Sequence, residues 1–395
     1  MNYKEIVQKK IDEIMPELIA LSNKIWDNPE YNFEEYIACE AFSELLRKFG
    51  FNVTVGMAGL ETACKGTYRG QKPGPHIGIF GEYDAVPGMG HACGHNLMAA
   101  MAVGAGTAIK GIIDELGGTI TVFGTPGEEG GGGKVIMLNA GAFDDLDLAM
   151  IIHSANETVV NDISYSKTDL TVNFYGKKSH AATWPEEGIS ALTPIIELFN
   201  IINASRLEIA DRGKILGIIS KGGHEPIMIP DHCQAKFTVR SFDMKYKIEL
   251  LNHLIKVCEN LANITKTKFE YKLDGYSYED IRNNPVLENL LAQNFENLGE
   301  MVQPRRKELG IGTTDVGNVT HKIPALQSYV QVVPLLRGHT LEFQEVVGGE
   351  KGHRAINIGA KAMAMTATDV LMDEKVLKEI KSEYLHMKEK YEWEV

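Results

Sequence analysis

The 395-residue sequence has few cysteines and fewer cationic than acidic residues. Its five cysteines are odd in number and scattered, which excludes a disulfide-stapled secreted scaffold and favours a reducing, cytoplasmic location. Lys and Arg number 40 against 53 Asp and Glu, and the net charge of −13 disfavours a surface that binds nucleic-acid phosphates. The first residues lack the apolar stretch of a secretory signal, so none is expected.

A membrane-spanning helix is not expected either, although one stretch of the chain lacks charge. Residues 85–109 contain no Asp, Glu, Lys or Arg, which by itself would suit lipid. The same stretch contains Pro87, His91, His95 and Asn96, which suit a buried site better. Glycine, in contrast, is abundant: 39 residues, about a tenth of the chain against a usual ~7%. We therefore expect tight turns and places where the backbone approaches another group closely.

Two styles of secondary structure divide the chain. In the first part, strands alternate with helices, and short apolar strands such as 76–80 are typical of a parallel sheet covered on both faces. A middle part shows the order β-α-β-β-α-β of the ferredoxin-like pattern, with its first helix expected at 186–210. The fold class is therefore α/β. We expect a mostly parallel sheet domain from residues 1–165 and 280–395, with a ferredoxin-like α+β domain of residues 166–279 inserted into it.

Residues that can bind metals follow three of the predicted apolar strands, where each strand ends. They are Asp84, Cys93 and His95 after the first strand, Glu128 and Glu129 after the second, and His153 at the end of the third. In open α/β sheets, ligands bind beyond the carboxyl ends of the strands. A thiolate with imidazoles and carboxylates suits zinc or another borderline cation. One of two adjacent carboxylates can bind a metal while its neighbour serves as general base.

The glycines that follow Glu129 could instead suggest a phosphate-binding loop. No Lys-Ser or Lys-Thr pair follows them, and two carboxylates that would repel phosphate precede them. We therefore discard the phosphate-binding loop and expect a metal site at this edge of the sheet.

Seven segments, spread over nearly the whole chain, carry a family resemblance. They are GEYDAVPG (81–88), GHACGHN (90–96), GTPGEEGGGGK (124–134), IIHS (151–154), GKKSHAA (176–182), GTTDVGN (312–318) and GHTLEF (338–343). In this order they resemble the aminoacylase and carboxypeptidase family of metallopeptidases, the M-twenty peptidases. They are most similar to its cysteine-containing amidohydrolase branch, which includes β-alanyl-lysine dipeptidases and aminobenzoyl-glutamate hydrolase.

The resemblance implies two divalent metal ions per subunit, zinc or manganese. Their ligands would be Cys93, His95, Glu129, His153 and His339. Five ligands can serve two ions if one of them bridges, and the thiolate of Cys93 is the candidate bridge. His353 competes with His339 for the last position. We prefer His339 because its surroundings, Gly-His-Thr-Leu-Glu-Phe, fit the family motif.

The resemblance also implies roles for residues that do not bind metal. Glu128 would be the general base that moves a proton from water to the leaving amine. Asp84 would orient a ligand imidazole. In relatives, the residue at the His180 position reaches the active site of the partner subunit and stabilises the oxyanion. Arg240 would bind the substrate carboxylate.

The implied protein is a homodimeric amidohydrolase with a catalytic domain split by a lid and dimerisation domain. Its substrates would be short dipeptides or N-acyl amino acids, with β-alanyl or γ-aminobutyryl conjugates of basic amino acids favoured. One alternative is an aminobenzoyl-glutamate or other N-acyl-amino-acid hydrolase. A second is a non-catalytic metal or peptide binder on the same scaffold, against which the presence of Glu128 argues. A third is a hydrolase that uses Cys93 as nucleophile without metal.

Two positions depart from the family pattern. Glu82 stands where many relatives have a metal-binding His, and Ile227 stands where an Asn usually helps to hold the substrate carboxylate.

Overall fold

The structure is a computed structural model that describes residues 2–304 and 311–391. It divides into two compact units. Unit 1 contains Met1–Ile163, Ile281–Gly310 and Asp315–Val395, and unit 2 contains Ser164–Asp280 and Ile311–Thr314. The divisions lie within two residues of the predicted domain boundaries, but the grouping of 311–314 with unit 2 was not predicted.

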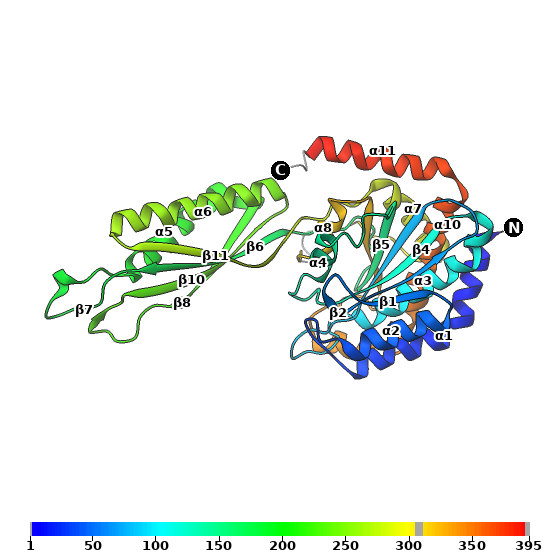
Figure 1. The fold of residues 1–395 in the computed structure, drawn as a ribbon, viewed down its shortest axis with the longest axis horizontal. Coiled ribbons are helices and arrows are strands. Elements are labelled where there is room, and N and C mark those ends of the chain that lie inside the picture. The colour runs from blue at the N-terminus through cyan, green and yellow to red at the C-terminus, as the bar shows by residue number, and fades with distance from the viewer. Residues whose placement is uncertain (1, 305–310, 392–395) are drawn as a thin grey trace. The chain divides into compact units, whose positions relative to one another are not determined.

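Unit 1 is built on a six-stranded sheet (Figure 1). Its strands are β1 (Asn52–Met57), β2 (Leu60–Arg69), β3 (His76–Glu82), β4 (Thr119–Thr125), β5 (Leu148–Ala155) and β12 (Ala325–Gln331). They lie in the order β1-β2-β4-β3-β5-β12. The last four in this order are parallel, whereas β1 and β2 form an antiparallel edge. The predicted α/β class with a mostly parallel sheet is confirmed.

Nine helices of unit 1 lie in the described part of the chain. They are α1 (Tyr3–Asp27), α2 (Tyr36–Lys48), α3 (His95–Leu116), α4 (Gly133–Asn139), α7 (Pro285–Asn297), α8 (Val316–Thr320), α9 (Leu341–Val347), α10 (Glu350–Met372) and α11 (Glu374–Tyr391). The central one, α3, packs against α1, α10 and strands β3, β4 and β5. Its small residues permit this close packing, because a Cβ at Gly104 would lie 2.7 Å from Leu18 and one at Gly106 2.1 Å from Val122.

The uncharged stretch of the sequence runs into helix α3. Among the described helices, only α3 is long and apolar enough to cross a membrane, and 89% of its apolar window is buried inside the protein. Its place between α1, α10 and the sheet explains that composition by packing in the core.

Unit 2 has a four-stranded antiparallel sheet covered by two helices. Its strands are β6 (Ser166–Tyr175), β8 (Gly213–Lys221), β10 (His232–Ser241) and β11 (Lys268–Tyr278), and its helices are α5 (Leu192–Ile209) and α6 (Met244–Thr265). The spatial order β11-β6-β10-β8 is that of the ferredoxin-like pattern. Alternate residues of β6, Leu170, Val172 and Phe174, are wholly buried in the core of this unit.

The predicted start of the first helix in unit 2 is wrong. Residues Pro185–Glu187 form only a short 3₁₀ turn, η1, and α5 begins six residues later than predicted, at Leu192. The intervening backbone is held by a bridge between Lys177 and Ile189, next to a small sheet of β7 (Ser179–His180) and β9 (Met228–Ile229). After α5, a second 3₁₀ turn, η2 (Ala210–Arg212), leads into β8.

Candidate metal centre

The candidate site lies in unit 1, at the edge where the four parallel strands end. Asp84 and Cys93 lie in the loop after β3, and His95 begins α3. Glu128 and Glu129 follow β4, His153 lies near the end of β5, and His339 follows β12. The residue pattern alone predicted three converging strand ends. The structure adds β12 as the fourth.

A left-handed glycine brings Cys93 and His95 to the same site. Gly94, between them, has φ +77°, and a Cβ at this position would lie 2.1 Å from the hydroxyl of Ser154 on β5. That hydroxyl donates a hydrogen bond to the carbonyl of Cys93 at 2.8 Å. Only glycine allows the loop to turn in this way so close to β5.

The side chains of all five predicted ligands come together. In three groups the potential ligand atoms lie within 4.8 Å of one another: Cys93, His95 and His153; Cys93, Glu129 and His339; and His95, Glu128 and Glu129. Cys93 belongs to the first two groups. Its Sγ lies 3.2 Å from His153 Nε2, and His339 Nε2 lies 3.4 Å from Glu129 Oε1. The role of each residue as a ligand stays a prediction.

Asp84 fixes the orientation of two of these residues. Its Oδ1 lies 3.1 Å from His95 Nδ1, and its Oδ2 accepts a hydrogen bond from the backbone N–H of Glu129 at 2.9 Å. Because Nδ1 is held by Asp84, the other ring nitrogen of His95 is available to a metal, as in the carboxylate–histidine–metal arrangement. Burial by itself would raise the pKa of Asp84, but His95 lowers it below its ordinary value.

The donor atoms fit a divalent cation. Within the described part of the chain, His95 Nε2 and Glu129 Oε1 are buried and make no hydrogen bond, and their nearest charged partners are Glu82 at 3.2 Å and His339 at 3.4 Å. A bound cation would satisfy both atoms. Burial and neighbouring His95 lower the pKa of His153 to about 4, so its imidazole is neutral, as a ligand must be. Burial and Glu129 raise the pKa of Cys93. A cation would favour its thiolate, and thiolate, imidazole and carboxylate are the zinc donors.

A buried lysine that sequence analysis missed lies next to this centre. Lys134, at the start of α4, is wholly buried, and its Nζ contacts Glu82 Oε1 at 2.5 Å and Asp315 Oδ1 at 2.7 Å. Burial would lower the pKa of Lys134, but Asp315 and Glu82 raise it. Burial, Glu82 and Glu129 raise the pKa of Glu128 well above its usual range. The one signal in the sequence that could have indicated Lys134 was its position as a lone cation at the start of a short apolar helix.

Glu82 reaches the centre through its second oxygen. Glu82 Oε2 lies 3.2 Å from His95 Nε2. The residue that replaces the usual metal-binding His of many relatives is therefore adjacent to the ligands, while Lys134 holds its first oxygen.

The two site residues predicted in the inserted domain lie in unit 2. His180 ends β7, and its Nδ1 accepts hydrogen bonds from the backbone N–H groups of Ala182 and Thr183 at 3.3 and 3.2 Å. The proton of the neutral ring therefore resides on Nε2. Arg240 lies near the end of β10, and its Nε is buried without a hydrogen-bond partner among the described residues. Their roles stay predictions.

Other polar residues have structural explanations. His353, the alternative ligand, lies in α10 with its Nε2 3.0 Å from Asn23 Oδ1, and it belongs to none of the ligand groups found in the described chain. Its contact agrees with the preference for His339.

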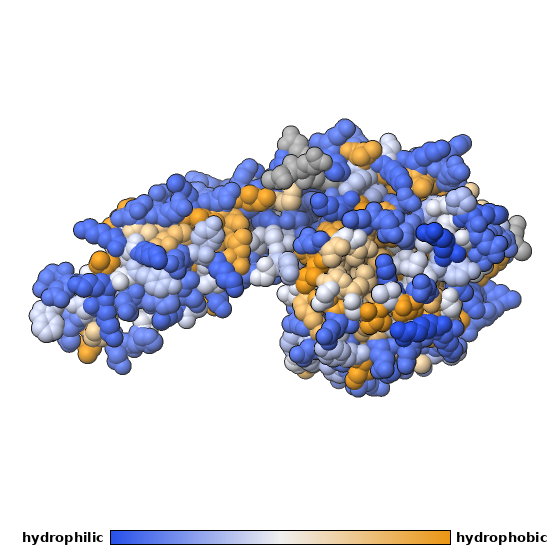
Figure 2. All heavy atoms as spheres, in the orientation of Figure 1, coloured by the Kyte–Doolittle hydropathy of each residue, from blue (hydrophilic) through white to orange (hydrophobic). Residues whose placement is uncertain are grey.

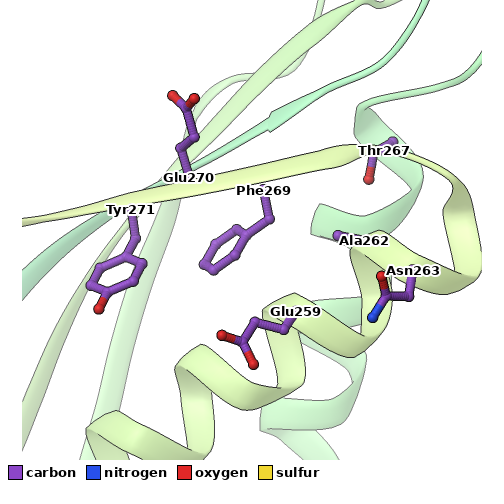
Figure 3. A pocket seen from close by; sticks show the side chains of 7 residues that line it. All are labelled: Glu259, Ala262, Asn263, Thr267, Phe269, Glu270 and Tyr271. Atoms are coloured by element: carbon purple, nitrogen blue, oxygen red, sulfur yellow. The ribbon is translucent and has the colours of Figure 1, made fainter.

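A separate pocket in unit 2, between α6 and β11, contains none of the predicted site residues (Figure 3). Its two carboxylates, Glu259 and Glu270, are each paired with a lysine.

Comparison with known proteins identifies the family. A family model described as Peptidase family M20/M25/M40 matches residues 78–367, well over half of the chain. The chain belongs to this family. This peptidase is 30% identical over 393 residues to Xaa-Arg dipeptidase of Homo sapiens, an alignment that covers 95% of this chain and 90% of the relative. It is 26% identical to a p-aminobenzoyl-glutamate hydrolase polypeptide of Escherichia coli (strain K12), with 92% and 91% covered.

Solved structures share the fold of this peptidase. A dinuclear metal-binding peptidase of the M20 family from Bacillus subtilis matches with a TM-score of 0.73 and 19% identity, covering 91% of this chain and 99% of that one. An aminobenzoyl-glutamate utilization protein from Klebsiella pneumoniae matches with a TM-score of 0.71 and 15% identity, covering 91% and 98%. The resemblance found in the motifs, and with it the prediction of a hydrolytic enzyme, is confirmed.

Proposed function

We propose that this peptidase hydrolyses the amide bond of short dipeptides or N-acyl amino acids at the candidate metal centre. The observation that carries the proposal is that two groups of ligand atoms share Cys93, with a further half-buried carboxylate, Glu128, beside them. Shared ligation by Cys93 would allow five side chains to serve two ions. The ligands would be Cys93, His95, Glu129, His153 and His339.

The proposed cations are zinc or manganese. Thiolate and imidazole donors favour zinc, and the carboxylate also suits manganese. When bound, such ions would polarise the scissile carbonyl and lower the pKa of water.

The side chains around the cations would move protons and hold the ligands in place. Glu128 would accept a proton from the attacking water and return it to the leaving amine. Its raised pKa, caused by burial and by Glu82 and Glu129, suits a group that must hold the proton between these steps. Asp84 would keep His95 and Glu129 in position through the two contacts described above.

Unit 2 would complete the site of a second protomer. His180 of one protomer would donate its Nε2–H to the oxyanion in the partner, and the contacts at its Nδ1 support this tautomer. Arg240 would bind the substrate carboxylate. A homodimer is also supported by the apolar surface of unit 2, visible in Figure 2. Leu216 and Ile218 are exposed on β8, a strand at the edge of the sheet, and such edges favour pairing with another chain.

Dipeptides with a basic C-terminal residue are the proposed substrates, with β-alanyl and γ-aminobutyryl conjugates included. The human relative is an Xaa-Arg dipeptidase, and the net charge of −13 would attract cationic substrates. The second candidate is an N-acyl glutamate, because another relative is part of a p-aminobenzoyl-glutamate hydrolase. We further propose that the enzyme is cytoplasmic.

Metal content and a substrate panel test the proposal together. We expect one to two equivalents of zinc or manganese per chain by elemental analysis. We also expect hydrolysis of basic dipeptides to be lost on chelation and restored by the metal. Hydrolysis of N-acyl glutamates instead would support the second candidate. Metal binding without hydrolysis of any panel member would indicate a binding protein.

Substitution of Cys93 separates the metal proposal from a thiol nucleophile. Cys93→Ala should lower both metal content and turnover, while Cys258→Ala, a buried cysteine of unit 2, should lower neither. Activity that resists chelation in the unsubstituted enzyme and disappears in Cys93→Ala would contradict the metal proposal and make Cys93 the nucleophile.

A further inference from the structure

We infer that residues 25–35, the last turn of α1 and the segment that leads to α2, position the loops that carry the proposed ligands and general base, with Glu35 as the principal positioning residue. We name this segment the brace. The inference rests on the proposed function for its catalytic consequence. Neither the ligand motifs nor the matched family region, residues 78–367, includes any part of the brace.

Glu35 holds the loop after β4. Its side chain is wholly buried, and its Oε1 accepts hydrogen bonds from the backbone N–H groups of Gly127 and Phe33, both at 3.0 Å. Its Oε2 accepts from the hydroxyl of Thr62 at 2.9 Å. Gly127 directly precedes Glu128, so the carboxylate of Glu35 acts one residue away from the proposed general base. Loss of this acceptor would leave a buried N–H without a partner, and the loop would shift to satisfy it.

The ring of Phe33 packs against the same loop, and the backbone of Phe33 adopts a strained conformation. It has φ +73°, which is an outlier for a bulky residue, and such strain persists only where the surrounding structure enforces it. A Cβ at Gly127 would lie 2.7 Å from the Phe33 ring, and one at Gly131 would lie 2.6 Å from it. The close approach expected from the glycine run is therefore made by Phe33 of the same chain.

The brace also contacts the loop after β3 and helix α9, which follows the loop that carries His339. The carbonyl of Glu30 accepts from the N–H of Ala85, the residue after Asp84, at 2.8 Å. The carbonyl of Ile25 lies 3.0 Å from Nε2 of His91, two residues before Cys93. Trp26 donates its indole N–H to the carbonyl of Gln344 in α9 at 2.8 Å. One short segment thus contacts the loops after β3 and β4 and helix α9, which directly follows the loop that carries His339, and this arrangement sets distances between ligands.

Three variants of neighbouring glutamates test the brace. Glu35→Met removes the acceptor at similar size. Glu35→Gln keeps an amide oxygen that can accept from Gly127. Glu34→Gln is the matched control, because Glu34 is exposed and adjacent. The readouts are kcat and KM, the visible spectrum of cobalt bound in place of the native metal, and amide hydrogen exchange of residues 124–134.

We expect Glu35→Met to lower kcat by about ten- to a hundredfold, because small misplacements of reacting groups have effects of this size. KM should change little, the cobalt spectrum should shift, and hydrogen exchange in 124–134 should accelerate about tenfold or more. Glu35→Gln should recover most of kcat, and Glu34→Gln should match the unsubstituted enzyme. A folded Glu35→Met enzyme with unchanged kcat, spectrum and exchange would overturn the inference. The inference would also be overturned if the activity of Glu35→Met fell only in proportion to the amount of folded protein.

Phe33→Gly covers the case in which Glu35→Met does not fold. Glycine adopts φ +73° without strain, so this variant removes the ring and keeps the backbone. It should lower kcat and accelerate exchange in 124–134, and unchanged values would contradict the brace. If the unsubstituted protein binds no metal and cleaves no amide, the proposed function fails. Hydrogen exchange still decides whether residues 25–35 order the loop.

Discussion

The sheet edge of unit 1 and the sheet of unit 2 bury different kinds of side chain. At the edge of unit 1, charged groups are buried together within a few ångströms, among them Glu82, Asp84, Lys134 and Asp315. The core cluster of unit 2 consists of aliphatic and aromatic residues and cysteines. Burial of charge costs free energy unless each charge is paired and hydrogen-bonded. The packing of unit 2 therefore explains its own sequence, whereas the buried acidic groups at the edge of unit 1 outnumber its buried lysine, and the proposed cations would balance this excess.

The buried charged residues of unit 2, Lys247 and Asp280 among them, support this distinction: Asp280 accepts a hydrogen bond from the backbone N–H of Met244 at 2.9 Å. Lys247 is almost wholly buried, but its Nζ donates to the hydroxyl of Ser277 at 2.7 Å and pairs with Glu279 at 3.2 Å. Its ammonium is therefore satisfied within the unit. In unit 1, His95 Nε2 and Glu129 Oε1 make no hydrogen bond within the described part of the chain, although Glu82 and His339 approach them at 3.2 and 3.4 Å. The two units therefore differ mainly in the number of charges that are buried together.

The largest expected effect comes from a one-atom change at the edge of unit 1. Glu128→Gln removes the proposed general base and keeps the shape of the side chain. We expect kcat to fall by about 10²- to 10⁴-fold, the usual contribution of a positioned acid–base group. Metal content should not change, because Glu128 is not among the proposed ligands. Initial rates and elemental analysis of the same preparation measure both.

The matched change in unit 2 is Glu259→Gln. Glu259 is exposed on α6 and lines the separate pocket of Figure 3. Its kcat and metal content should equal those of the unsubstituted enzyme. Equal losses in the two variants would contradict the assignment of chemistry to unit 1.

Sequence patterns were sufficient for the parts of the structure that local chemistry determines. The apolar strand 76–80 and its neighbours were found because strands buried on both faces are almost wholly apolar. The convergence of Cys93, Glu129 and His153 followed from the rule that parallel strands end at one edge. The helix predicted from residue 186 failed because contacts far along the chain, such as the pairing of β7 with β9, decide the backbone there.

The missed residues share a physical cause. Glu35 contacts Gly127, 92 positions away, and Lys134 contacts Asp315, 181 positions away. Nothing in the sequence near Glu35 indicates such a partner, and no local pattern predicts the positive φ of Phe33. His339 was assigned through the family motif alone, because the residues by themselves did not show that the chain after β12 returns to the same edge.

A smaller effect is expected from substitution of His180, the histidine of unit 2 that would take part in catalysis. His180→Ala should lower kcat by about 10²- to 10³-fold, the usual cost of losing one oxyanion donor. Metal content should remain unchanged, since the proposed ligands all lie in unit 1. His253→Ala, an exposed histidine on α6, is the control and should have no effect.

Mixing two inactive variants sharpens this prediction. If His180 serves the partner subunit, a heterodimer of Glu128→Gln and His180→Ala protomers contains one complete site. After unfolding and refolding together, about a quarter of the activity should return, because half of randomly formed dimers are mixed and each has one good site of two. No recovery, despite exchange of protomers shown by mass, would place His180 in its own protomer's site or remove it from catalysis.

The smallest expected effect concerns a half-buried carboxyl of unit 1, away from the metal centre. Burial is the main cause that raises the pKa of Glu288, on α7, to about 7, and the charge of Asp162 adds to it. In the unfolded chain this carboxyl titrates near 4.5. Between these values the folded protein holds a proton that the unfolded chain has released. Stability from this group is therefore complete below about pH 4.5 and is lost as pH rises through about 7.

Glu288→Gln should remove this loss of folding stability at high pH, because the amide stays neutral at every pH. Above pH 7 the variant should be more stable than the unsubstituted protein by roughly 1–3 kcal/mol, and near pH 4.5 the two should converge. Urea unfolding of the metal-free proteins at pH 5 and pH 8 measures this, with the exposed Glu296→Gln on the same helix as control. A stabilised variant would show that unit 1 tolerates an unfavourable carboxyl outside the centre, so burial of charge alone does not mark a ligand site. The cluster of potential ligand atoms around Cys93 would then be what distinguishes the edge. A pH-independent difference would contradict the raised pKa.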